Sequence, residues 1–166
     1  MNVEDLNVQQ LKNVVENHRR KGATNAPLFR EALRELESRT GKGLNFDRSF
    51  EAIRAAAKDR RFLSYKDLSD ASGAEWTKVH YEVGGHLWRL VEYAHLMGWP
   101  MLSAIVVNKP NVSTGSMEPA TLKGFVAAAR ALRIPVTDEQ RFLREQQERV
   151  FEWGAKQLDV ETTYDS

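Results

Sequence analysis

Residues 64–87, SYKDLSDASGAEWTKVHYEVGGHL, predict a short helix, a turn and a second helix in immediate succession. The short helix is expected over residues 65–71 and the second over residues 76–97, with Gly84 and Gly85 inside it. Each glycine in a helix interior costs roughly 1 kcal/mol relative to alanine. The pair therefore indicates that something approaches the helix backbone closely, either nucleic acid or another part of the same chain.

The composition is that of a single soluble unit. The chain has 166 residues, of which 42% are hydrophobic, enough for one core. It carries 24 basic and 23 acidic residues, so any attraction to a polyanion must come from local clusters of charge. The absence of cysteine excludes disulfides, thiolate nucleophiles and zinc–cysteine sites. No apolar run approaches the ~20 residues of a membrane span and no signal segment is recognisable, which favours a cytoplasmic protein without membrane contact.

The N-terminal part predicts a helical hairpin over residues 1–43. Its first helix is expected over residues 3–20. The second begins at Asn25 or Ala26, with Pro27 in its first turn, and stops at Gly41. The stretch TGKGLNF, residues 40–46, is the best linker in the chain, so we place a soft domain boundary there.

The rest of the chain predicts helices around one short strand. A third helix is capped by Asp47, and the apolar, β-branched run over residues 101–107 has the length of a buried strand. A helix follows over residues 121–132, and the sequence TDEQ at Thr137 matches a capping box that opens the last helix. The fold class is therefore mainly α with a small β element. The main domain is expected over residues 44–135, a C-terminal helix over 136–158 and a flexible tail over 159–166.

Two stretches, FDRSFEAIRAAAKDRRFLSYKDLSDASG and VGGHL, carry a family resemblance. They resemble the C-terminal domain of the alkylguanine-DNA alkyltransferases and the alkyltransferase-like proteins. The positions that match are Phe46, Asp47, Ser64, Tyr65, Leu68, Gly73, Val83, Gly84 and Gly85, followed by Pro100, the strand AIVVN and Gly115. The resemblance covers roughly residues 46–130. It implies a winged helix-turn-helix core that binds duplex DNA through the helix from Trp76 to Met97.

The departures from that family exclude its chemistry. Its enzymes carry Pro-Cys-His-Arg, whereas this chain has Pro100, Met101, Leu102 and Ser103. A thioether does not ionise and leucine is not a base, so alkyl transfer is absent and we expect no enzymatic activity. The arginine that the family inserts into the duplex falls at Tyr81, which can wedge or stack but lacks the charge.

The resemblance implies two sets of site residues. Those expected to contact DNA are Arg60, Arg61, Tyr65, Lys66, Lys78, Tyr81, Gly84, Gly85 and Arg89. The vestigial pocket comprises Tyr65, Trp99, Pro100, Met101 and Ser103, and we expect bulky apolar side chains to fill it. The alternative interpretation of the basic residues is a solvated helix end, where cations complement the helix dipole.

No catalytic, metal or cofactor site is expected elsewhere. His80 and His86 are six residues apart, so they do not share a helix face, and no carboxylates complete a metal site with them, His18 or His95. No arrangement typical of a serine hydrolase or a phosphate-binding loop is present.

A second function remains open from the sequence. The chain would then be a protein-interaction module that binds or inhibits a partner in nucleic-acid processing or genome defence. Its near-neutral net charge of +1 and the missing arginine favour this view. An exposed apolar stripe on the terminal helices would identify the binding surface.

Overall fold

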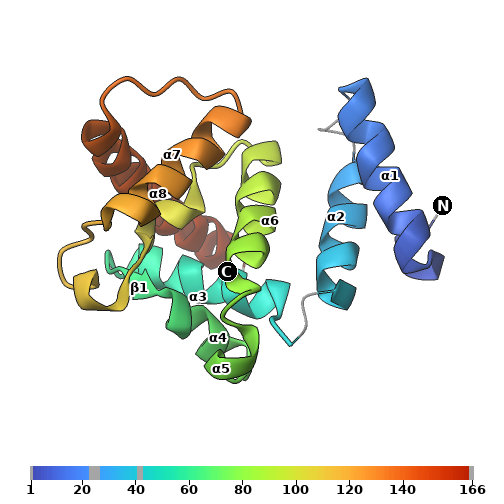
Figure 1. Ribbon diagram of the computed structural model, residues 1–166, viewed down its shortest axis with the longest axis horizontal. Helices are drawn as coiled ribbons and strands as arrows, with labels where there is room; N and C mark the ends of the chain where they lie inside the picture. Colours follow the sequence, from blue (N-terminus) through green and yellow to red (C-terminus); the bar gives the residue numbers. More distant parts are fainter. Residues whose placement is uncertain (1, 23–26, 41–42, 165–166) are drawn as a thin grey trace.

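The computed structural model describes residues 2–22, 27–40 and 43–164, with side chains up to residue 156 apart from Thr40. It is mainly helical, as expected, and its small β element is a two-stranded parallel sheet (Figure 1). The α-helices are α1 (Val8–Lys21), α2 (Pro27–Thr40), α3 (Phe46–Lys58), α4 (Tyr65–Ala71), α5 (Trp76–Val79), α6 (Val83–Leu96), α7 (Pro119–Ala131) and α8 (Glu139–Tyr164). The strands are β1 (Leu63–Ser64) and β2 (Val106–Val107), and short 3-10 helices are η1 (Val3–Asp5), η2 (Leu102–Ile105) and η3 (Lys109–Asn111).

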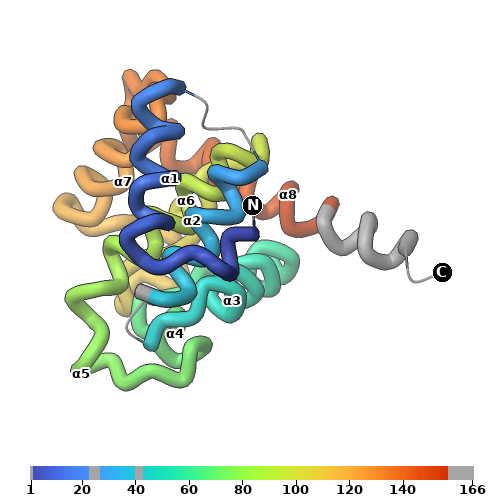
Figure 2. Tube along the Cα trace, turned by 90° about the vertical axis from the view of Figure 1, so that its right-hand side faces the viewer, coloured from blue at the N-terminus to red at the C-terminus, as the bar shows by residue number. Residues whose placement is uncertain are grey.

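The N-terminal hairpin has its own small apolar core. Leu11 and Val15 of α1 pack against Phe29, Leu33 and neighbouring apolar residues of α2. Figures 1 and 2 place α2 between α1 and α6, so α2 joins the hairpin to the rest of the molecule. The hairpin is therefore an added layer against α6 and not part of the larger core.

The first helix begins later than the sequence predicted, because Asn7 caps α1 with a reciprocal capping box. Residues 3–5 form a separate 3-10 turn instead. The predicted start of the second helix, at residue 25 or 26, and the predicted stop at Gly41 lie outside the described residues.

The larger core lies between α3, α8, η2 and the two strands. Gly154 of α8 packs directly against α3, since a Cβ atom built on it would lie 2.6 Å from the Cβ of Ala57. The strands pair in parallel with Leu63 opposite Val106 and Ser64 opposite Val107. This core holds α4, α6 and α7 in place around it.

The strand predicted over residues 101–107 is mostly wrong. Only Val106 and Val107 are strand, while residues 102–105 form η2. All seven residues are buried. A short run that is buried on every side has no periodicity to distinguish strand from helix, which explains the error.

Two helix caps also differ from the prediction. Asn45, not Asp47, caps α3 by accepting a hydrogen bond from the Arg48 N–H. Asp138, not Thr137, caps the last helix by accepting one from the Arg141 N–H. That helix continues to Tyr164, beyond the end at residue 158 that we expected, and residues 165–166 lie outside the described residues.

The predicted long helix over residues 76–97 is broken. It consists of α5 and α6, separated by His80, Tyr81 and Glu82. Consecutive glycines lower helix propensity by roughly 2 kcal/mol relative to alanines, which favours a turn at this point. Gly84 and Gly85 consequently occupy the first turn of α6 and not a helix interior.

We predict that the same substitution has opposite effects at two helix glycines. Gly154→Ala should destabilise the protein by about 1–3 kcal/mol, because the new methyl group overlaps α3. Gly124→Ala should stabilise it by about 0.5–1 kcal/mol, because no atom lies within 4 Å of the new methyl group and alanine favours α7. Urea denaturation measures both. Equal effects at the two sites would contradict the close α3–α8 packing.

Candidate nucleic-acid interface and adjoining pocket

The glycine pair lies at the surface, in the first turn of α6. Both residues are exposed, and apart from its chain neighbours and the backbone of α6 itself no atom lies within 4 Å of a Cβ built on Gly84. A Cβ on Gly85 would meet only the Arg89 side chain, at 3.6 Å. Packing against Tyr65 or the predicted strand, the alternative explanation for the pair, is therefore contradicted.

This helix end also lacks a side-chain cap. Glu82 occupies the N-cap position, but its side chain makes no capping hydrogen bond. The N–H groups of a first helical turn have no partner within the helix, and the dipole places partial positive charge there. The start of α6 thus combines backbone donors with two residues that have no side chain to cover them.

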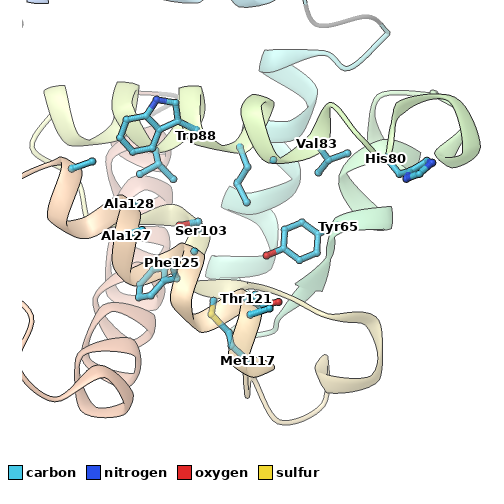
Figure 3. Close-up of a pocket in the computed structure, with 16 residues that line it drawn as sticks. Tyr65, His80, Val83, Trp88, Ser103, Met117, Thr121, Phe125, Ala127 and Ala128 are labelled. Atoms are coloured by element: carbon cyan, nitrogen blue, oxygen red, sulfur yellow. The ribbon is translucent and has the colours of Figure 1, made fainter.

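A cavity of about 700 Å³ opens beside this turn, between α6 and α7 (Figure 3). Val83, Leu87 and Val91 of α6 form one wall and small residues of α7 form the other, while Gly84 lies at its edge. This volume falls in the range of small-molecule sites, roughly 300–1,000 Å³. The cavity is therefore large enough for a small planar ligand, and Gly84 of the glycine pair lines it.

Two hydroxyl groups line this apolar cavity without a partner. Figure 3 shows the Tyr65 hydroxyl pointing into it from α4. Ser103, only 9% exposed, lines it from η2. Neither hydroxyl has a hydrogen-bond partner among the described residues. Neither oxygen is among the fully enclosed side-chain atoms that lack a partner, so both face the space of the cavity, where they can hydrogen-bond a ligand or water.

Burial raises the pKa of the Tyr65 phenol above its ordinary value of 10.0. The hydroxyl is therefore protonated at neutral pH. It acts as a donor as well as an acceptor inside the cavity.

The predicted vestigial pocket is split between two cavities. Tyr65 and Ser103 line the cavity between α6 and α7, but Trp99, Pro100 and Met101 line a second cavity of about 520 Å³ beside α8. The expectation that bulky side chains fill the pocket is also wrong. Met101 and its neighbour in η2 turn into the core, which leaves the space next to Tyr65 open.

The cations predicted to contact DNA all have carboxylate partners. The ion pairs are Arg60–Glu148 at 2.7 Å, Arg61–Asp59 at 3.7 Å, Lys66–Asp70 at 3.2 Å, Lys78–Glu75 at 3.3 Å and Arg89–Glu37 at 2.9 Å. The first four pairs are exposed, and exposed pairs contribute little stability, about 0–1 kcal/mol, whereas Arg89 pairs with the buried carboxylate of Glu37. They nevertheless reduce the positive potential of the surface, so these residues do not form an uncompensated basic face.

Sequence reasoning missed a buried polar network centred on Glu37. The His86 Nδ1 atom contacts a Glu37 carboxylate oxygen, and His86 Nε2 lies 2.8 Å from the Ser49 hydroxyl. These three side chains come from α2, α6 and α3, so no local spacing signals their meeting. They have the order of a Ser-His-acid triad but are fully buried, and Ser49 lines none of the cavities described for the molecule. The network therefore joins the hairpin to the core and has no access to a substrate.

Within the described ranges, no three histidine, aspartate or glutamate side chains gather as a metal site would require. None of the helices in those ranges is long and apolar enough to cross a lipid bilayer.

No family model matches the chain, and comparisons with curated proteins and with solved structures found no match. The site must therefore be interpreted from its own geometry.

We predict that the Tyr65 hydroxyl gives the protein a specific alkaline sensitivity. Because its pKa is raised in the folded state, its contribution to stability is present below pH 10 and is lost as pH rises above that value. The free energy of unfolding should fall more between pH 8.5 and 10.5 for the wild type than for Tyr65→Phe. Urea denaturation at both pH values tests this, with Tyr81→Phe as the exposed control. Identical pH dependence in wild type and Tyr65→Phe would contradict the burial of this hydroxyl.

Proposed function

We propose that the chain is a non-catalytic, alkyltransferase-like winged-helix protein that binds duplex DNA through the start of α6 and accepts one extruded base in the adjoining cavity. The observation that carries the proposal is the position of Gly84, which is exposed at the first turn of α6 and also borders the cavity. The bare backbone lets a phosphate approach the N–H groups of that turn, as anions do at helix N-termini. A base leaving the duplex there enters the cavity directly.

The cavity suits a nucleobase in its chemistry. Its walls are apolar, and the hydroxyls of Tyr65 and Ser103 provide donors and acceptors for the edge of a planar heterocycle. The absence of cysteine and of a basic partner bonded to Ser103 supports recognition of the base without any change to it.

Tyr81 is positioned to take the place of the extruded base. It lies in the turn between α5 and α6, is 86% exposed, and packs its ring against His80 with centroids 3.9 Å apart. His80 in turn lines the cavity. Exposed side chains that wedge between base steps have this arrangement, next to the groove-binding element.

The paired cations favour the alternative, an interaction module for a protein partner. That view expected an exposed apolar stripe on the terminal helices. Among the described residues, the large apolar side chains that are exposed are Tyr81, Met97 and Val112, and none of them lies on α1, α2 or α8. We therefore retain DNA binding as the proposal and make protein binding the alternative.

We predict that Gly84→Glu abolishes DNA binding without loss of stability. A glutamate in the first turn of a helix is favourable, and no neighbouring atom obstructs the new side chain at its Cβ. The carboxylate repels phosphate and covers the cavity entrance, so affinity for a labelled duplex should fall at least tenfold in fluorescence anisotropy. Gln140→Glu is the matched control, because it adds the same charge at the same position in the first turn of α8. Equal affinity for both variants, or no duplex binding by the wild type at low salt, would refute the proposal.

The fluorescence of 2-aminopurine measures base extrusion separately from DNA binding. A duplex containing 2-aminopurine should become more fluorescent when the wild type binds, because the base leaves the stack. Tyr81→Ala should reduce that increase more than it reduces affinity, since the wedge stabilises the vacated step. If the duplex binds but its fluorescence does not change, DNA binding is supported and the cavity is excluded as a base site.

A further inference from the structure

The outer flank of α7 is the other charged surface that borders the cavity. Residues 119–137 contain Lys123, Arg130 and Arg133 but no aspartate or glutamate. All three cations are exposed, and we call this set the cationic flank. The carboxylates next along the chain are Glu118, at the N-cap position of α7, and Asp138, which caps α8.

The cationic flank differs from the α4–α6 surface in its pairing. None of its three cations has an ion-pair partner among the described residues, whereas each basic residue predicted to contact DNA has one. A paired cation must give up its carboxylate to bind phosphate. An unpaired cation only releases or exchanges solution ions, and it therefore contributes more to polyanion binding.

The flank also lies beside the cavity. Ala120, Gly124 and Ala127 of α7 line the cavity wall opposite α6. At 3.6 residues per turn, Lys123 and Arg130 fall on one side of α7, adjacent to Ala127. They are seven residues apart, which corresponds to roughly 10 Å along the helix axis. A strand whose base enters the cavity thus has unpaired cations on the flank of α7 next to the far wall, although none of them lines the cavity itself.

The backbone of Arg133 is unusual for its residue type. It follows the end of α7 with φ of 62°, a left-handed conformation that glycine adopts more readily. A non-glycine residue there costs of order 1 kcal/mol, so the side chain is retained at a small expense in stability. Arg60, which is paired with Glu148, adopts the same conformation with φ of 53°, so the backbone of Arg133 bears on the choice of a test variant and not on binding itself.

We propose that the cationic flank binds the phosphodiester backbone of the DNA strand whose base occupies the cavity. The inference rests on the proposed function and assigns the phosphate contacts mainly to Lys123, Arg130 and Arg133, not to the paired cations between residues 60 and 89. DNA then straddles the cavity, with the start of α6 on one side and α7 on the other.

The salt dependence of duplex binding tests this assignment. The slope of log K against log salt concentration should become less steep by about 2 for the double variant Lys123→Gln/Arg130→Gln and by about 1 for Arg133→Gly. Arg133→Gly should also stabilise the fold, because glycine relieves the left-handed backbone, so its loss of affinity is separate from folding. Lys12→Gln on α1 removes an exposed cation on the other side of α6 and should leave the slope unchanged (Figure 1).

The outcomes separate this inference from the function on which it rests. If the wild type binds duplex and Gly84→Glu weakens it, but the slope is unchanged in the flank variants, the flank assignment alone is wrong. Tighter binding of a polyglutamate peptide than of duplex, lost in the same variants, would assign the flank to an acidic protein partner and overturn the proposal. A less steep slope of log K against log salt concentration in both flank variants, with no change in Lys12→Gln, would support the assignment of the phosphate contacts to the cationic flank.

Discussion

The turn at residues 80–82 is the constraint on which the site depends. It is held from both sides, because Val79 before it and Val83 after it are buried in the same core. In one continuous helix, the N–H groups of residues 83–85 would bond to carbonyls of the preceding turn. The break instead starts a new helix at Val83. The two glycines that follow have no side chains, so the backbone of this first turn is exposed. The exposed helix end and the projecting Tyr81 ring follow from this one interruption, next to the cavity that His80 and Gly84 line.

Local signals predicted the elements whose ends are set by neighbouring residues. The bounds of α4 were correct because Ser64 and Asp67 form a capping box at its start, and the glycine of the next turn stops it. Tertiary contacts decided the rest. The apolar run over 101–107 is mostly a 3-10 helix inside the core, with Met101 and Leu102 buried there while Ser103 lines the cavity beside Tyr65. The open cavity therefore could not be predicted from the bulk of Met101 alone.

The long-range ion pairs could not be predicted from the sequence either. Arg60 meets Glu148 and Arg89 meets Glu37, partners that lie 88 and 52 positions away along the chain. Glu37 is fully buried, and it ties the N-terminal hairpin to α6 through both Arg89 and His86. The hairpin, which the family resemblance does not cover, thus holds the helix that presents the glycine pair. Removing one member of such a buried pair is costly, because the other charge remains without compensation.

The central proposal is that duplex DNA binds at the first turn of α6, beside the cavity. Two-dimensional amide NMR during titration with a duplex tests it most directly, because glycine amides resonate in a separate region of the spectrum. The amide signals of Gly84, Gly85 and Gly124 should shift, while those of Gly22 in the hairpin and the buried Gly154 should remain unchanged. Shifts confined to other surfaces, with these three glycine amides unaffected at saturation, would contradict it.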